Sequence, residues 1–171
     1  MSDFRRLALT TPHGLIASGF GSGLAPIAPG TAGSLAAIPF YLLLHQLTVW
    51  QYLVVMLAAF VLGVWASERS SRELGQHDYG GIVWDEFVGQ WLTLLACPLQ
   101  WWAIAAGFFL FRLFDVWKPP PISWLDRRVS GGFGIMIDDV VAAGYAWLAL
   151  QGVIYMITGD VFLGLGPKAP F

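Results

Sequence analysis

The spacing of the charged side chains constrains this chain more than any other feature of its sequence. After Arg5 and Arg6, the next charged residue is Glu68. Two further stretches without charge cover residues 87–111 and 140–159. A helix needs about 20 mainly apolar residues to cross a bilayer, so these stretches have room for several membrane helices. The pattern predicts an all-α, polytopic membrane protein with roughly four or five membrane-embedded helices and a Gly/Pro-rich N-terminal loop.

The composition agrees with a membrane protein and excludes other classes. Hydrophobic residues make up 57% of the 171 residues and charged residues 12%, whereas soluble domains usually carry about a quarter charged residues. A net charge of -2 provides no basic face for nucleic acid. The single cysteine, Cys97, allows neither a disulfide framework nor a Cys-based metal site. The length suits one domain over residues 1–171, with 1–12 and 159–171 predicted to be peripheral tails.

The uncharged stretches also predict how the chain folds back within the membrane. The polar but uncharged residues His45, Gln46 and Thr48 separate two apolar runs, which predicts a helical hairpin. Residues 87–111 fit either one long span or a second hairpin, and Pro98 favours the hairpin because proline disrupts a helix interior. The first arm of that hairpin would extend only about 17 Å as a helix, so we expect it to be shallow or buried by protein. Residues 140–158 predict a final span.

This topology also predicts an orientation in the membrane. Every lysine and arginine except Lys168 falls on one side. Since loops rich in Lys and Arg tend to stay in the cytoplasm, we expect that side to be cytoplasmic. The acidic residues would then lie near the membrane surface.

Five acidic residues stand next to the apolar stretches. Asp85 and Glu86 begin one stretch, Asp115 follows its end, and Asp138 and Asp139 directly precede the last span. Carboxylates beside an apolar helix are costly unless they bind something, although a wet helix N-terminus also accommodates them. Each pair alone leaves both explanations open, but five acids on three helix ends of one face would repel strongly without cations. Oxygen ligands without a Cys or His cluster predict Mg²⁺, or alternatively Mn²⁺.

Asp115 also stands between two cationic residues. Arg112, Asp115 and Lys118 follow a three-residue spacing, which places them along one slowly drifting stripe of a helix. An Arg and a Lys beside an Asp can hold a phosphate and a divalent cation together. A local ion pair with snorkelling side chains at a helix end would give the same pattern.

A glycine-rich segment covers residues 19–34. Its glycines would let the backbone approach a ligand closely. We expect Thr31 or Ser34 to cap the following helix, whose N-terminal amides would attract phosphate. Without other evidence, a close-packed, broken membrane helix is the better explanation of the glycines, and the common nucleotide-binding motifs are not met.

Four stretches resemble the phosphatidylglycerophosphatase A family in order and spacing, namely residues 21–35, 82–89, 111–122 and 131–139. The resemblance implies an all-helical, Mg²⁺-dependent lipid phosphatase of the bacterial cytoplasmic membrane, with its active site on the cytoplasmic face. Such an enzyme removes the terminal phosphate of phosphatidylglycerophosphate in phospholipid biosynthesis. Its implied partner is the phospholipid substrate; nucleic acid is not expected, and no protein partner is inferred.

The resemblance also assigns roles to residues. It implies metal-binding and catalytic roles for the five acids Asp85, Glu86, Asp115, Asp138 and Asp139. It implies contacts to the substrate phosphate for Arg112, Lys118, Ser22, Gly30 and Thr31. A membrane transporter that uses the acids as a cation site is the alternative function, although transport sites lie near the bilayer midplane.

Overall fold

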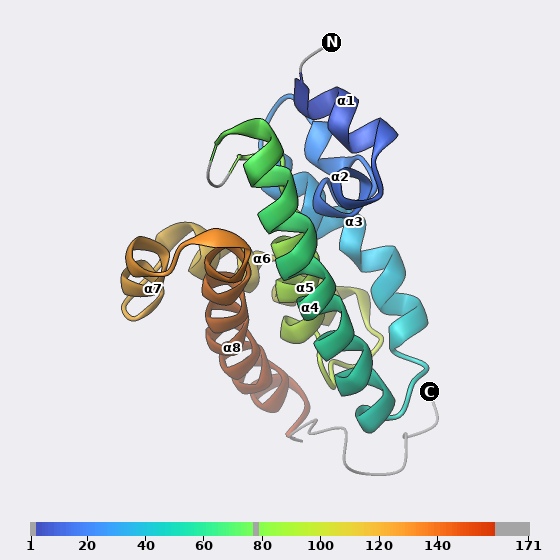
Figure 1. Cartoon of the computed structure of the whole chain (residues 1–171). Helices are drawn as coiled ribbons and strands as arrows, with labels where there is room; N and C mark the ends of the chain where they lie inside the picture. The colour runs from blue at the N-terminus through green and yellow to red at the C-terminus, as the bar shows by residue number, and fades with distance from the viewer. Residues whose placement is uncertain (1–2, 77–78, 160–171) are drawn as a thin grey trace.

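A computed structural model describes residues 3–76 and 79–159, so His77, Asp78 and the predicted tail beyond residue 159 lie outside the described residues. The described ranges hold eight α-helices, one 3-10 turn and no strand, which confirms the all-helical prediction (Figure 1). The elements are α1 (Asp3–Thr10), α2 (Pro12–Ala17), η1 (Ser22–Leu24), α3 (Pro29–Leu44), α4 (Val49–Leu74), α5 (Trp84–Thr93), α6 (Trp101–Trp117), α7 (Ile122–Arg128) and α8 (Gly131–Thr158).

Helices α3 and α4 form the first predicted hairpin (Figure 1). The turn at residues 45–48 ends in a capping box, because the Thr48 hydroxyl accepts the Gln51 N–H and the Gln51 side chain accepts the Thr48 N–H. Helix α4 ends at Gly75, which adopts the left-handed conformation (φ 65°) that glycine tolerates best. The uncharged polar residues therefore mark the turn as the sequence predicted.

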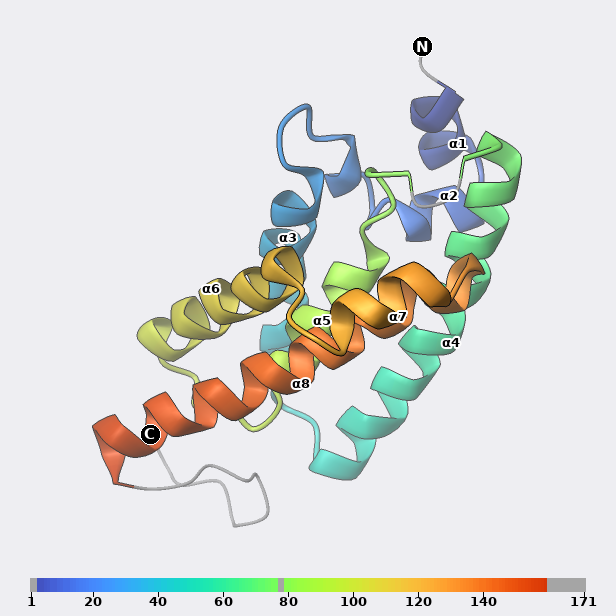
Figure 2. The same ribbon diagram turned by 90° about the vertical axis from the view of Figure 1, so that its left-hand side faces the viewer.

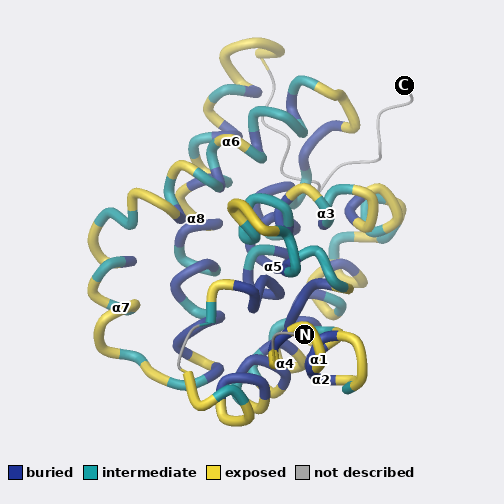
Figure 3. Tube along the Cα trace, turned by 90° about the horizontal axis from the view of Figure 1, so that it is seen from above, coloured by how far each residue is buried: buried dark blue, intermediate teal, exposed yellow. Residues whose placement is uncertain are grey.

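Helices α5 and α6 form the second hairpin, and Pro98 lies in the turn between them. Helix α5 has ten residues, about 15 Å, so it is too short to cross a bilayer. It is buried at the centre of the molecule (Figure 3) and is tied to both helices of the first hairpin. The Trp91 indole donates to Ala37 O at 2.9 Å, and the Tyr52 hydroxyl donates to Trp91 O at 2.7 Å. The protein-buried arm is thus confirmed over the single long span.

Helix α8 begins earlier than the sequence suggested and packs against α4, α5 and α6 (Figure 2). The prediction that Asp138 and Asp139 lie at a helix end is wrong, because α8 starts at Gly131 and both acids lie in its interior. A side chain at Gly132 would meet Val64 O at 2.1 Å, so this glycine lets α8 pack directly on α4. Glu68 also accepts the Gly132 N–H at 2.6 Å and satisfies a donor at the start of α8. The glycines that precede the predicted span are therefore part of the same helix, in close contact with α4.

Two described helices, α4 and α8, are long and apolar enough to cross a membrane by length and composition, and α3 is apolar but shorter. The outward face of α4 is rich in large apolar side chains. The exposed ones are Trp50, Leu53, Val54, Leu57, Val61, Leu62 and Trp65. Residues 3–10 of the predicted N-terminal tail form α1, which packs against α2 and α4 and buries Phe4 and Leu7.

Candidate active site

The five predicted acids converge on one cavity of about 360 Å³. Asp85 and Glu86 lie in the first turn of α5, Asp115 near the end of α6, and Asp138 and Asp139 in the interior of α8. The other residues that line the cavity are Gly80, Ile82, Lys118, Asp126, Val129, Gly134 and Ile135. Residues more than fifty positions apart in the sequence thus contribute carboxylates to a single site.

Three of the acids form the tightest group. Asp85, Glu86 and Asp139 each offer a carboxylate oxygen within 4.8 Å of the other two. Asp85 Oδ1, Glu86 Oε2 and Asp139 Oδ2 are buried and have no hydrogen-bond partner among the described residues. Buried polar atoms are nearly always satisfied, and hard cations such as Mg²⁺ prefer carboxylate oxygens. The donor set and its unpartnered oxygens therefore fit a divalent cation.

The electrostatics of α5 agree with that fit. Burial raises the pKa of Asp85 well above its ordinary value, and the charges of Glu86 and Asp139 raise it further. Burial, with the charge of Asp115, raises the pKa of Glu86 to about 7 despite the nearby Arg112. Without a cation, the charged forms of these carboxylates are disfavoured. A bound divalent cation would remove that penalty.

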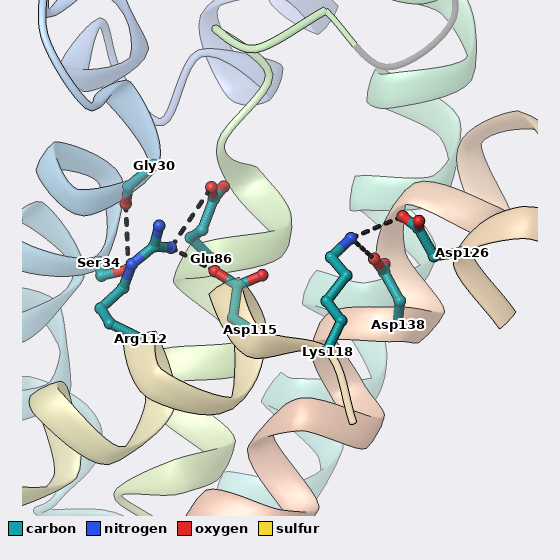
Figure 4. Close-up of polar contacts among 8 residues, drawn as sticks. All are labelled: Gly30, Ser34, Glu86, Arg112, Asp115, Lys118, Asp126 and Asp138. Carbon is teal, nitrogen blue, oxygen red and sulfur yellow. Dashed lines mark hydrogen bonds and ion pairs between the residues drawn. The ribbon is translucent and has the colours of Figure 1, made fainter. Parts of the chain in front are cut away.

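Arg112 occupies one side of the site. Its guanidinium Nη1 lies 2.5 Å from Asp115 Oδ2 and 3.7 Å from Glu86 Oε1 (Figure 4). Gly30, at the start of α3, packs against the same group, since a Cβ there would lie 2.1 Å from Glu86 Oε1 and 3.2 Å from Arg112 Nη2. The local ion pair considered from the sequence is therefore present, and it is part of the site.

Lys118 occupies the other side. Its Nζ lies 2.6 Å from Asp138 Oδ2 and 2.6 Å from Asp126 Oδ1 (Figure 4). Burial lowers the pKa of Lys118, but the hydrogen bonds to the two carboxylates outweigh burial and raise it overall. Asp126, on α7, was not predicted as a site residue. Only its position eight residues after Lys118, beyond a proline turn, connects the two in the sequence.

The glycine-rich segment contributes less than expected. Helix α3 begins at Pro29 after Ala28, without a side-chain cap, so the prediction that Thr31 or Ser34 caps this helix is wrong. The Ser34 hydroxyl donates to Gly30 O at 3.1 Å, and the Ser22 hydroxyl donates to Gly19 O at 2.8 Å. Ser22 and Thr31 are not among the residues that line the cavity, whereas Gly30 adjoins it through Glu86.

Comparison with known proteins decides the family. The family model described as phosphatidylglycerophosphatase A matches residues 15–154. The chain belongs to the phosphatidylglycerophosphatase A family. All four sequence stretches that resemble this family lie within the matched residues, and together they supply most of the side chains that surround the cavity.

Two curated members of the phosphatidylglycerophosphatase A family are similar over nearly their whole length. The phosphatidylglycerophosphatase A of Escherichia coli (strain K12) is 50% identical over 161 residues, which cover 94% of this chain and 91% of the relative. The phosphatidylglycerophosphatase A of Haemophilus influenzae is 46% identical over 156 residues, which cover 90% of this chain and 96% of the relative. A putative phosphatidylinositol-3-phosphatase of Bacteroides thetaiotaomicron is 39% identical over 151 residues, which cover 84% of this chain and 94% of the relative. No solved structure matches this chain.

Proposed function

We propose that this family member is a phosphatidylglycerophosphatase, which hydrolyses the terminal phosphomonoester of phosphatidylglycerophosphate to phosphatidylglycerol and phosphate in phospholipid biosynthesis. The observation that carries the proposal is a single cavity with a compact carboxylate group between two cationic side chains. The phosphatase activity named for the relatives from Escherichia coli and Haemophilus influenzae supports the choice of substrate.

Asp85, Glu86 and Asp139 would hold Mg²⁺, because their unpartnered oxygens offer the ligands that this ion prefers. A bound Mg²⁺ would supply Lewis-acid polarisation of a phosphoryl oxygen. Asp115 and Asp138 remain predicted ligands, and each already pairs with a cationic side chain. Six carboxylates line the cavity, so an added cation also reduces their mutual repulsion.

The two cationic side chains would bind the phosphate. Arg112 is held by Asp115 and Lys118 by Asp138, so both charges are fixed at the site before substrate arrives. Fixed donors stabilise the charge that builds on the phosphoryl oxygens without reorganising during the reaction. Hydrolysis also needs an acceptor for a proton of the attacking water, and Asp138 Oδ1, which has no hydrogen-bond partner among the described residues, is suited to this role.

The same proposal includes a multi-pass arrangement in the bacterial inner membrane, with the site on the cytoplasmic face. It is supported by the two helices that could cross a membrane and by the two hairpins packed with them. Arg69, Arg72, Arg127 and Arg128 all lie outside the long apolar stretches. They lie near the C-terminal ends of α4 and α7, and an excess of Lys and Arg beside membrane helices favours the cytoplasmic side, which supports the proposed orientation.

The depth of the site supports an enzyme over a transporter. A side chain at Gly63 of α4 would meet Trp84, which directly precedes Asp85 on α5, and Met136, which lies two residues before Asp138 on α8. Gly63 precedes the charged Glu68 by five residues, or about 7.5 Å of helix. The midplane of a hydrocarbon core lies about 15 Å from its edge. The acids would therefore lie closer to the membrane surface than a transport site does.

A comparison of substrates tests the proposed function. Purified protein in detergent with Mg²⁺ is given phosphatidylglycerophosphate, phosphatidic acid or phosphatidylinositol 3-phosphate, and the lipid products are identified by mass spectrometry. We expect phosphatidylglycerol as the main product. Preferential cleavage of phosphatidylinositol 3-phosphate would contradict this substrate and indicate the phosphatidylinositol-3-phosphatase activity named for the Bacteroides relative. Cation flux in proteoliposomes without lipid hydrolysis would favour the transporter.

A further inference from the structure

Asp126 lines the cavity but belongs to none of the residue groups that the sequence singled out. It shares the Lys118 ammonium with Asp138, and both oxygen–nitrogen distances are 2.6 Å. We propose that Asp126 is a positioning residue, which orients the Lys118 ammonium so that it meets a phosphate oxygen of the substrate. This inference rests on the proposed phosphatase function.

The chemistry of an ammonium group explains why two carboxylates are needed. Lysine has three N–H donors on a flexible four-carbon stem. Asp126 and Asp138 take two of them, which fixes the direction of the third within the described part of the site. With Asp138 as its only partner, the ammonium could rotate about a single contact.

The chain path between Lys118 and Asp126 is built to bring them together. Lys118 ends α6 in the left-handed conformation (φ 46°, ψ 57°), which is uncommon for a residue other than glycine. The proline turn that follows is anchored by the Tyr145 hydroxyl, which donates to Pro120 O at 3.2 Å. Helix α7 then starts at the fully buried Ile122. These contacts return Asp126 to the cavity, although most of α7 is exposed (Figure 3).

The two carboxylates differ in burial, and the difference predicts different effects. The Asp138 side chain is 8% exposed and the Asp126 side chain 38% exposed. Asp138 therefore makes the deep contact beside the candidate cation ligand Asp139, whereas Asp126 holds Lys118 from the rim. Loss of the Asp126 charge should weaken substrate binding more than it slows the chemical step.

Asp126→Asn tests the inference, because asparagine keeps the size and one acceptor oxygen but removes the charge. We expect KM for phosphatidylglycerophosphate to rise about five- to tenfold, as for loss of one charge-assisted contact, with kcat within about twofold of wild type. Asp126→Glu should restore part of the affinity. Asp3→Asn, which makes the same charge change on α1, serves as the matched control and should leave both constants unchanged.

A double-mutant cycle separates positioning from a structural role. In a Lys118→Gln background there is no ammonium to orient, so Asp126→Asn should add no further rise in KM. An unchanged KM in Asp126→Asn, or the same fold-change in both backgrounds, would overturn the inference.

A binding measurement distinguishes this inference from the proposed function. Inorganic phosphate with Mg²⁺ should raise the thermal unfolding temperature of the wild-type protein, and Asp126→Asn should reduce that shift. If the wild-type protein releases no phosphate from lipid but shows this Asp126-dependent shift, the phosphatase function fails and the positioning role stands. If phosphate protects both proteins equally, the positioning role fails.

Discussion

Replacement of Gly30 by alanine tests how closely α3 must approach the site. The added Cβ would lie 2.1 Å from Glu86 Oε1, whereas ordinary van der Waals contact begins at 3.4 Å, so the carboxylate must move by about 1.3 Å. Glu86 belongs to the group of three acids that fits a cation and also faces Arg112 at 3.7 Å. A misplacement of about 1 Å in an active site can cost roughly 100-fold in rate. We therefore expect kcat/KM of Gly30→Ala to fall about 100-fold, or about 2.7 kcal/mol.

The fold should tolerate the same substitution. The clashing atom is the end of a flexible side chain, and alanine is favoured over glycine in a helix by about 0.5–1 kcal/mol. Gly144→Ala is the matched control, because Gly144 lies inside α8 with open space around it. Phosphate release and thermal unfolding are measured for both variants in the same detergent. If Gly30→Ala is folded and its kcat/KM stays within about threefold of wild type, this account of the α3 contact is refuted.

Three further predictions concern the packing and the cation ligands. Glu68→Gln should lower the free energy of unfolding by about 1 kcal/mol, because the side chain that accepts the Gly132 N–H loses its charge. Denaturant titration in detergent measures this free energy, and an unchanged value would mean that the contact does not stabilise the fold. Tyr52→Phe should cost about 1 kcal/mol with activity retained, because Trp91 O keeps the Leu94 N–H as a donor; a large loss of activity would contradict a purely structural role. Asp85→Asn should weaken Mn²⁺ binding at least about tenfold by electron paramagnetic resonance, whereas Asp3→Asn should not; equal affinity in both would exclude Asp85 as a ligand.

The arrangement of the hairpins could be predicted from the sequence because charge and proline act locally. An uncharged polar turn at residues 45–48 and the turn that contains Pro98 both divide apolar runs at the places where the structure reverses direction. The convergence of the five acids could also be predicted, because each acid lies beside an apolar stretch of the sequence and the apolar stretches must pack against one another.

The remaining features depend on contacts between distant residues. The start of α8 was missed because the predicted span was limited to the uncharged residues after Asp139, whereas the helix begins at Gly131 and Gly132 makes the close contact with Val64. Asp126 was missed because, in the sequence, it is one exposed charge among several, and only the turn after Lys118 brings it to the cavity. The expected cap at Thr31 failed because Pro29 already begins the helix two residues earlier.

The most direct test of the central claim is phosphate release from phosphatidylglycerophosphate by detergent-purified protein, with Mg²⁺ and then with EDTA, for the wild type and Asp139→Asn. Asp139 belongs to the group of three acids that fits a cation, and asparagine keeps its shape while removing the charge. We predict rapid release that requires Mg²⁺ in the wild type and almost none in the variant. Release that persists in EDTA, or in folded Asp139→Asn at the wild-type rate, would contradict a cation-dependent lipid phosphatase built on these carboxylates.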